Sequence, residues 1–394
     1  MMSATLSRLS APVSKLLLVA LLAAPALYAP TPAADAENRR MAAAPSAPAS
    51  VAELLAYPPR IDAWVNDHFG LRDALVRLNT RLRYRLFGQF PTPQVIAGRE
   101  GRIFMATYQP AAAAYSGVFA ACGYQQDLTA QLSGEIEHSL GLLLAQGINA
   151  RLLVVPSAPV VHSAQLPEWL SRACPAAGTP MSKLLAAGTL TPAVRERVDY
   201  PLALMQQAAA GGDVFPRTFF HWGGLGPRLV SDWLVPHAHP GASWRGTPYV
   251  SAPQQKPSDI GHIFPGLRLD STVETLDLAK SGIEQCWGAA CYPEMADVLA
   301  KFGESARYRN PAAPLGRLVM MSDSYGPPSW PWFARYYREV VAVNTNSMDA
   351  LKPADLARLR AFLFSNHDDE VLVLYHDATV HAGRLSQDFK LLMP

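Results

Sequence analysis

Short apolar runs alternate with amphipathic segments through most of the chain. Four of these runs have the length and the glycine, proline or polar bounds of buried strands. Helix, short link and apolar strand is the repeating unit of α/β proteins, so we predict an α/β fold with a parallel sheet flanked by helices. The predicted strands are Ala150–Val155, Leu318–Met321, Val340–Val343 and Glu370–Leu374. The predicted helices are Gln125–Gln146, Pro201–Ala210, Leu225–Leu234, Trp332–Arg338 and Pro353–Phe364.

The pattern changes before this core and in its middle. Val95–Phe104 reads as a strand, turn and strand that open the main domain, which we expect to span residues 61–394. Residues 236–310 are rich in proline, glycine and aromatic residues, which predicts a loop-rich insertion. A helix is also predicted near Leu71–Leu86, with leucines at steps of three or four and arginines on its other face. That basic stripe indicates either a solvated face or contact with anionic lipid or an acidic polymer.

The N-terminus has the pattern of an export signal. Arg8 and Lys15 precede an apolar stretch, residues 16–29, that is short for a bilayer span and typical of a signal peptide. We predict a signal peptide or an N-terminal membrane anchor in residues 1–33, and both alternatives stay open. The alanine, proline and serine of residues 34–60 predict a flexible tether.

Composition narrows the function classes. The chain has 394 residues, 49% of them hydrophobic, which is enough for a sizeable core. Its net charge of +2 does not favour nucleic acid as a partner. Four cysteines fit an exported protein, and we propose the disulfides Cys122–Cys174 and Cys286–Cys291. Four cysteines allow three pairings, and a metal site is the weaker alternative because the spacing is not that of a zinc knuckle.

Candidate chemistry appears where the run Leu318–Met321 breaks into small and polar residues. Ser324 is expected just beyond the carboxyl end of this strand, where open α/β sheets place their ligands. A second stretch, Arg217–Gly224, supplies His221 in a glycine-rich setting. Ser324 and His221 are our candidate nucleophile and base.

Six short motifs in one order resemble the AlgJ/AlgX alginate O-acetyltransferases and their SGNH hydrolase-like relatives. The resemblance runs from about Glu37 to Asp377. It implies a flavodoxin-like core, a periplasmic location and acetyl transfer to an exopolysaccharide, without a cofactor. It also implies a membrane-bound O-acyltransferase as the partner that supplies the acetyl group. The motifs are Glu37-x-Arg39, Asn66-Asp-His-Phe-Gly-Leu-Arg-Asp73, Val95-Ile-x-Gly98-x-x-Gly101, Val154-Val-Pro-Ser157, Phe220-His-Trp222 and Ser322-Asp-Ser324.

The resemblance also implies residue roles. In the family the serine of the Asp-Ser motif attacks the acetyl donor and the histidine of the His-Trp motif activates it, which here are Ser324 and His221. Such chemistry needs donors aimed at the developing oxyanion, and the backbone N–H of Ser324 is one. The supporting residues that we expect are Asp323, Ser157, Trp222 and Gly326.

The chain departs from this pattern at the triad acid. Relatives carry an aspartate two residues before the histidine, where this chain has Phe219, and no acid lies between Pro216 and Ser231. Asp213 would have to reach back across several residues, and a backbone carbonyl is the other group able to hold His221. Further departures are Ser322 for glycine, Pro159 for lysine and Arg102 for tryptophan.

Three functions therefore stay open: an O-acetyltransferase with a serine and histidine dyad, a non-catalytic subunit that binds glycan or docks the acyltransferase, and a carbohydrate acetylesterase. Two minor candidates lie elsewhere. His237 and His239, with Asp232, form a possible metal-ligand set that is more often a solvated turn. An aromatic cluster follows the nucleophile and suits either sugar stacking or core packing: Trp330, Trp332, Phe333, Tyr336 and Tyr337.

Overall fold

The computed structural model describes residues 15, 16, 19, 42–68, 70–174, 178–243 and 249–393. The chain divides into two compact units, residues 1–92 with 260–268 and residues 93–259 with 269–394. Residues 61–92, which the sequence assigns to the predicted domain over residues 61–394, belong to the first unit. Most of the predicted signal or anchor, residues 1–33, lies outside the described residues. Within the described part of the chain, no helix has the length and hydropathy that crossing a membrane requires.

The described part of the first unit is mainly helical. Its helices are α2 (Val51–Leu55), α3 (Tyr57–His68) and α4 (Arg72–Phe87), so the range expected to be a tether becomes helical at residue 51. In α4, the predicted basic helix, Thr80 is buried and the predicted leucine stripe is exposed. The segment 260–268 contacts α4 through a hydrogen bond from Arg81 Nε to the carbonyl oxygen of Gly266 (2.7 Å).

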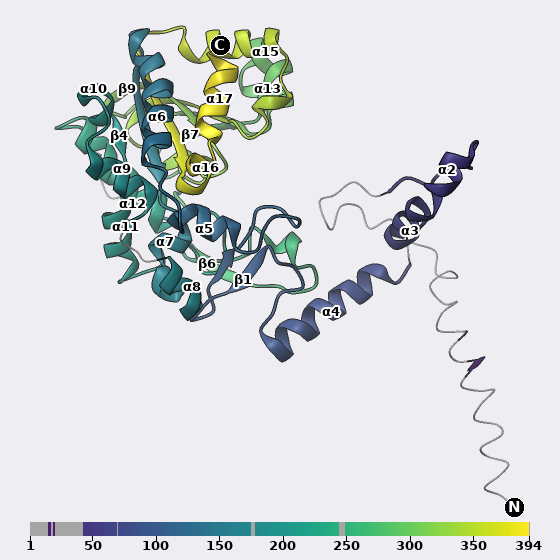
Figure 1. The fold of residues 1–394 in the computed structure, drawn as a ribbon. Helices are drawn as coiled ribbons and strands as arrows, with labels where there is room; N and C mark the ends of the chain where they lie inside the picture. Colours follow the sequence, from purple (N-terminus) through teal and green to yellow (C-terminus); the bar gives the residue numbers. More distant parts are fainter. Residues whose placement is uncertain are drawn as a thin grey trace, which may run out of the picture. The chain divides into compact units, whose positions relative to one another are not determined.

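The second unit, whose helices and strands are drawn in Figure 1, is built on a seven-stranded sheet. The strand order is β4-β3-β11-β9-β10-β8-β7. The five strands from β4 to β10 are parallel, whereas β8 and β7 add an antiparallel edge. The predicted α/β fold with a largely parallel sheet flanked by helices is therefore confirmed. The strands are β3 (Asn149–Val155), β4 (Val198–Asp199), β7 (Glu284–Trp287), β8 (Ser305–Arg309), β9 (Leu315–Ser322), β10 (Tyr337–Asn344) and β11 (Glu370–His376).

The sheet separates two apolar cores because successive side chains of a strand point to opposite faces. On β9, Leu318 and Met320 join one core, and Val319 and Met321 join the other. The first core includes residues of α5 (Ser116–Cys122), α7 (Ala158–Val161), α11 (Leu202–Ala209) and α12 (Leu225–Ala238). The second includes residues of α6 (Thr129–Ala145), α9 (Pro180–Ala187), α13 (Ala296–Phe302), α15 (Pro353–Phe364) and α17 (Arg384–Leu392).

Most predicted elements exist in the structure, with two corrections. The predicted helix Trp332–Arg338 is wrong, because α14 covers only Trp330–Phe333 and β10 begins at Tyr337. The region 236–310 does not lie wholly outside the core, because it supplies both antiparallel strands, β7 and β8. It also forms a small sheet of β5 (Gln254–Pro257) with β6 (Asp270–Val273), while the predicted hairpin is β1 (Val95–Ala97) with β2 (Ile103–Met105).

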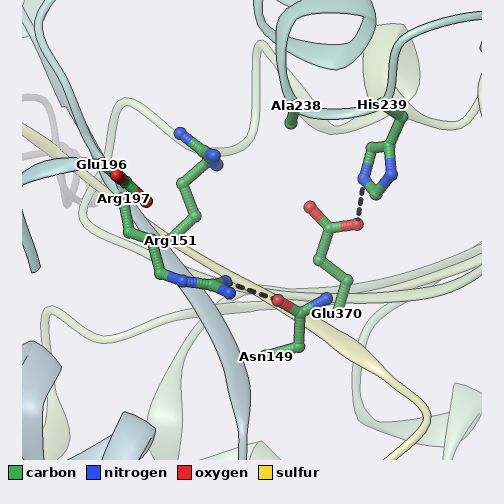
Figure 2. A pocket seen from close by; sticks show the side chains of 7 residues that line it. All are labelled: Asn149, Arg151, Glu196, Arg197, Ala238, His239 and Glu370. Carbon is green, nitrogen blue, oxygen red and sulfur yellow. Dashed lines mark hydrogen bonds and ion pairs between the residues drawn. The ribbon is translucent and has the colours of Figure 1, made fainter. Parts of the chain in front are cut away.

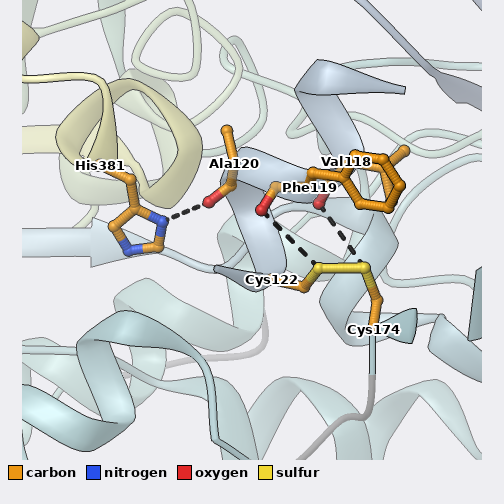
Figure 3. The surroundings of a disulfide bond; sticks show 6 residues. All are labelled: Val118, Phe119, Ala120, Cys122, Cys174 and His381. Atoms are coloured by element: carbon orange, nitrogen blue, oxygen red, sulfur yellow. Dashed lines mark hydrogen bonds between the residues drawn. A yellow bond between two sulfur atoms is a disulfide. The ribbon is translucent and has the colours of Figure 1, made fainter. Parts of the chain in front are cut away.

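Both proposed disulfides are present. Cys122 at the end of α5 is bonded to Cys174, which follows α8 (Glu168–Ala173), as Figure 3 shows. His381 Nδ1 donates a hydrogen bond to the carbonyl oxygen of Ala120 in α5 (2.7 Å). The second bond, Cys286–Cys291, ties the end of β7 to the turn that follows it. These covalent links restrict the unfolded chain and so favour the folded one.

A buried histidine beside α7 makes stability depend on pH. Burial, together with the positive charge of Arg102, lowers the pKa of His162 from 6.5 to about 3. Below pH 6.5 the His162 imidazole becomes protonated in the unfolded chain and stays neutral in the folded one. Lowering the pH therefore lowers the free energy of unfolding. Between pH 7 and pH 5 we expect His162 to contribute a loss of roughly 2 kcal/mol.

Urea titrations followed by tryptophan fluorescence at these two pH values measure this loss. In His162→Phe the difference in unfolding free energy between them is expected to shrink by that amount. His138→Gln, which alters an exposed residue of α6, serves as the matched control and is expected to keep the parent's pH dependence. An unchanged pH dependence in His162→Phe would contradict the assignment.

Candidate active site

The nucleophile candidate lies in a turn that a buried carboxylate holds. Strand β9 ends at Ser322, and Asp323 turns inward with 1% of its surface exposed. Its carboxylate accepts hydrogen bonds from the backbone N–H of Tyr325 (2.9 Å), from the backbone N–H and Nδ1 of His376 (2.9 and 2.7 Å) and from Thr379 Oγ1 (2.7 Å). Burial acts to raise the pKa of Asp323, but His376 and these hydrogen bonds lower it below its ordinary value.

Asp323 is therefore a structural anchor for the turn that presents Ser324. Gly326 closes the same turn through a hydrogen bond from its N–H to the carbonyl oxygen of Asp323 (3.0 Å). A Cβ at this position would collide with the Ser322 side chain, so only glycine fits. The N–H of Gly326 is occupied by this bond. The N–H of Ser324 has no hydrogen-bond partner among the described residues, so it is the candidate oxyanion donor.

The acid that appeared to be missing comes from a distant segment. His221 Nδ1 lies 2.7 Å from Asp259 Oδ2, and the Asp259 carboxylate also accepts the backbone N–H groups of Phe220 and His221 (2.9 Å each). The expectation that the triad acid is lost, leaving a backbone carbonyl to hold the imidazole, was wrong. A carboxylate on Nδ1–H fixes the proton there, which leaves the Nε2 lone pair as the base.

Asp259 is placed by the small sheet within the predicted insertion. It follows β5 by two residues, and β5 pairs with β6. The preceding residue, Ser258, donates its hydroxyl to the carbonyl oxygen of Thr218, and Thr218 bonds Ser271 on β6. These contacts bring the Asp259 segment against the His221 segment, although 38 residues separate the two in sequence.

Asp213, the other acid considered for this role, is engaged elsewhere. It forms ion pairs with Arg102 (2.7 Å) and Arg217 (3.0 Å). Arg102 has 1% of its surface exposed and also donates to the carbonyl oxygen of Phe215 (3.0 Å). Burial lowers the pKa of Arg102 to about 10, with Asp213 acting in the opposite direction. Asp213 is thus bound by Arg102 and Arg217 and forms no hydrogen bond with His221 among the described residues.

The histidine and serine segments are bonded to each other through Tyr325. Trp222 Nε1 donates to the carbonyl oxygen of Tyr325 (2.6 Å), and the Tyr325 hydroxyl donates to the carbonyl oxygen of Phe220 (3.1 Å). The Tyr325 ring stacks on His376 and meets His221 edge-on, with centroid distances of 4.4 and 5.5 Å. The predicted supporting role of Trp222 is therefore structural, because it fixes the turn that carries Ser324.

Ser324, His221 and Asp259 line one cavity of about 500 Å³. Ser324 is half-buried, and the side chains of His221 and Asp259 are 26% and 21% exposed, although the His221 Nε2 atom itself is buried. His221 Nε2 has no hydrogen-bond partner among the described residues, Ser324 included. The structure thus brings the candidate nucleophile and the candidate base to the same cavity without a hydrogen bond between them. Other lining residues are Phe219, Trp222, Lys256, Glu274, Trp287 and Trp332.

Ser157, the remaining supporting residue, lies outside the lining of this cavity. Its hydroxyl donates to Asp377 (2.6 Å), and its backbone N–H donates to the same carboxylate (3.2 Å). Asp377 follows His376 at the end of β11, so the Ser157 turn is tied to the strand beside it. Ser157 is therefore a packing residue in this structure and not a donor to the cavity.

The proposed metal ligands are not brought together. Figure 2 shows His239 donating to Glu370 (2.7 Å) in a pocket near the start of β3 and β11, beside Arg151 and Arg197. Asp232 pairs instead with Arg335, and His237 stacks on Trp233. No group of three potential ligands capable of holding a metal occurs among the residues that the structure describes.

The aromatic cluster beyond Ser324 belongs to the core. Its five members are at most 3% exposed, which excludes sugar stacking for them in this structure: Trp330, Trp332, Phe333, Tyr336 and Tyr337.

No family model matches the sequence, and no curated protein matches it. The fold is similar to that of several solved structures. Bacillus cereus PatB1 with a sulfonyl adduct has a TM-score of 0.47 and 13% identity, over 73% of this chain and 95% of that chain. The O-acetyltransferase domain of Pseudomonas putida AlgJ has a TM-score of 0.42 and 18% identity, over 75% and 98%. Pseudomonas aeruginosa AlgX has a TM-score of 0.32 and 11% identity, over 72% and 61%.

AlgJ and AlgX, which the sequence motifs resemble, are therefore among the structural neighbours of this chain. Because every one of these TM-scores is below 0.5, the likeness alone assigns no activity.

Proposed function

We propose that the protein is a serine O-acetyltransferase that transfers acetyl groups to hydroxyls of an exopolysaccharide. The observation that carries the proposal is the hydrogen bond between His221 Nδ1 and Asp259, with Nε2 left without a hydrogen-bond partner among the described residues and with His221 and Ser324 lining one cavity. A nucleophile, a base and an acid that orients the base are the parts that acyl transfer through a serine requires.

In the proposed first half-reaction, Ser324 Oγ attacks the carbonyl carbon of an acetyl ester, and its proton passes to His221 Nε2. Asp259 stabilises the resulting imidazolium, and the N–H of Ser324 donates to the oxyanion. The ester bond then breaks, and the leaving group takes the proton from His221. The product is an acetyl ester on Ser324.

In the second half-reaction, a sugar hydroxyl attacks the acetyl-serine carbonyl and gives its proton to His221. The bond to Ser324 Oγ breaks, and the proton returns to that oxygen, so the enzyme is regenerated. Water competes with the sugar for the same acyl-enzyme. A cavity that excludes water from the carbonyl would therefore separate a transferase from an acetylesterase.

The location and the partner belong to the same proposal. The basic and apolar N-terminal pattern and the two disulfides support the periplasm, either free or anchored at the inner membrane. The chain uses no cofactor in this scheme, so the acetyl donor comes from outside. A membrane-bound O-acyltransferase is the partner that the resemblance suggests for this supply.

Trapping the acyl-enzyme tests the proposal. Full-length protein is mixed with p-nitrophenyl acetate, quenched in acid, digested and analysed by mass spectrometry. We expect an acetyl group on the peptide that contains Ser324, and its transfer to glycan when a suitable oligosaccharide is added. Ester turnover with the label on another residue would contradict the assignment of Ser324. Absence of both turnover and label would favour the non-catalytic, glycan-binding subunit.

A further inference from the structure

One tryptophan of the cavity is placed differently from the others that line it. Trp222 and Trp332 are 1% and 3% exposed, whereas Trp287 is 49% exposed. Trp287 therefore presents indole surface to whatever occupies the cavity. Large exposed aromatic side chains in a cavity that also holds polar groups are typical of ligand contacts.

The Trp287 ring is held in position before any ligand arrives. Trp287 ends β7, where it pairs with Ala306 of β8. Its neighbour Cys286 points to the other face of the strand and is bonded to Cys291. Behind the exposed ring lies buried Trp330, with the two ring centroids 5.6 Å apart. A surface that is fixed in this way loses little conformational entropy on binding.

Polar groups stand beside the exposed indole. Gln285, two residues earlier on β7, also lines the cavity and donates to the Tyr308 hydroxyl (2.9 Å). Glu304 and Lys256 line the cavity as well. An apolar ring face with donors and acceptors around it matches a pyranose ring, whose C–H groups lie on its faces and whose hydroxyls lie at its rim.

The charges of the cavity select among glycans. Among the described residues that line it, three carry carboxylates: Asp259, Glu274 and Glu304. Lys256 is the single lysine or arginine among them. A chain of uronates would bring one more carboxylate with each sugar, and like charges at short distance repel. The lining therefore favours an uncharged glycan over a polyuronate such as alginate.

We infer that Trp287 is the stacking platform for a sugar ring of an uncharged glycan, the acceptor in the proposed acetyl transfer. The role of this glycan as the acetyl acceptor rests on the proposed function. The binding of the glycan to Trp287 does not depend on catalysis. Two readouts, calorimetric binding of oligosaccharides and initial rates of p-nitrophenyl acetate hydrolysis, therefore separate the two claims.

The experiment uses the full-length protein with cellohexaose and β-mannohexaose as uncharged probes and hexamannuronate as the charged one. Trp287→Ala is expected to weaken binding of at least one uncharged probe about tenfold. Ester hydrolysis by the parent protein in the absence of sugar is measured beside it, so that binding and catalysis are read separately. Trp169→Ala is the matched control, because Trp169 is also 49% exposed but lies on α8, outside the lining of the cavity.

The charge claim has its own variant. In Glu274→Gln combined with Glu304→Gln, binding of hexamannuronate is expected to strengthen while that of the uncharged hexaoses holds. The difference should diminish as salt is added, because these two carboxylates are exposed. The inference would be overturned if Trp287→Ala bound every uncharged probe as well as the parent does. It would also be overturned if the parent bound hexamannuronate more strongly than the uncharged hexaoses. If the parent showed no hydrolysis that depends on Ser324 but still bound an uncharged probe through Trp287, only the proposed function would be overturned.

Discussion

Ser324→Ala is expected to reduce kcat for p-nitrophenyl acetate by roughly 10⁴- to 10⁶-fold, close to the rate without a nucleophile. The reason is that Ser324 is the nucleophile candidate on the cavity that His221 also lines, and His221 Nε2 has no hydrogen-bond partner among the described residues. Alanine removes the hydroxyl and leaves the backbone N–H of the turn in place. The loss should therefore fall on kcat, since binding of ester and glycan does not need the hydroxyl. Initial rates of p-nitrophenolate release measure it.

The matched control is Ser365→Ala, at an exposed serine that follows α15. It is expected to keep the parent's kcat and the parent's urea midpoint. If Ser324→Ala retained the parent's rate, the hydrolysis would come from another group, and Ser324 would not be the nucleophile.

Asp259→Asn is expected to lower kcat by roughly 10³- to 10⁴-fold. The asparagine amide has one oxygen where the carboxylate has two, so its NH2 group faces a backbone N–H that Asp259 accepted, from either Phe220 or His221. The amide also carries no negative charge, so it no longer stabilises the imidazolium that forms when His221 takes the proton of Ser324. The KM for the ester is expected to change little, because Asp259 acts on the substrate through His221.

A second carboxylate–histidine pair of the same length provides the control. Glu370 accepts from His239 at 2.7 Å, in the separate pocket of Figure 2. Glu370→Gln alters the same chemistry without touching the cavity of Ser324, so kcat is expected to stay within about twofold of the parent's. Equal losses in Asp259→Asn and Glu370→Gln would show a general effect on folding and not a role in the triad.

The periodicity of the sequence predicted most of the parallel core. The apolar runs of β3, β9, β10 and β11 are buried on both faces, which gives them a strong signal. The helix predicted at Trp332–Arg338 failed because its aromatic residues recur at helical spacing. In the structure they reach the core from a short helix, a turn and the start of β10. Side-chain spacing cannot distinguish these backbones over so few residues.

The candidate site was only partly predictable. Ser324 and His221 lie in local motifs that can be read directly, and the structure places both on one cavity. Asp259 could not be predicted, because its position depends on the β5–β6 pairing and on Ser258 bonding Thr218. No sequence spacing encodes those contacts. The motif that the sequence resembles has its acid two residues before the histidine, and Phe219 stands at that position. The hydrogen bond to His221 Nδ1 needs only a nearby carboxylate, which can come from any part of the chain.

A double-mutant cycle on His221 and Asp259 tests the central claim, that these two residues act as one unit on Ser324. The kcat for p-nitrophenyl acetate is measured for the parent, His221→Gln, Asp259→Asn and the double variant. If Asp259 acts only through the imidazole, the double variant will be as slow as His221→Gln alone, within about threefold. A double variant whose loss equals the product of the two single losses would contradict the account.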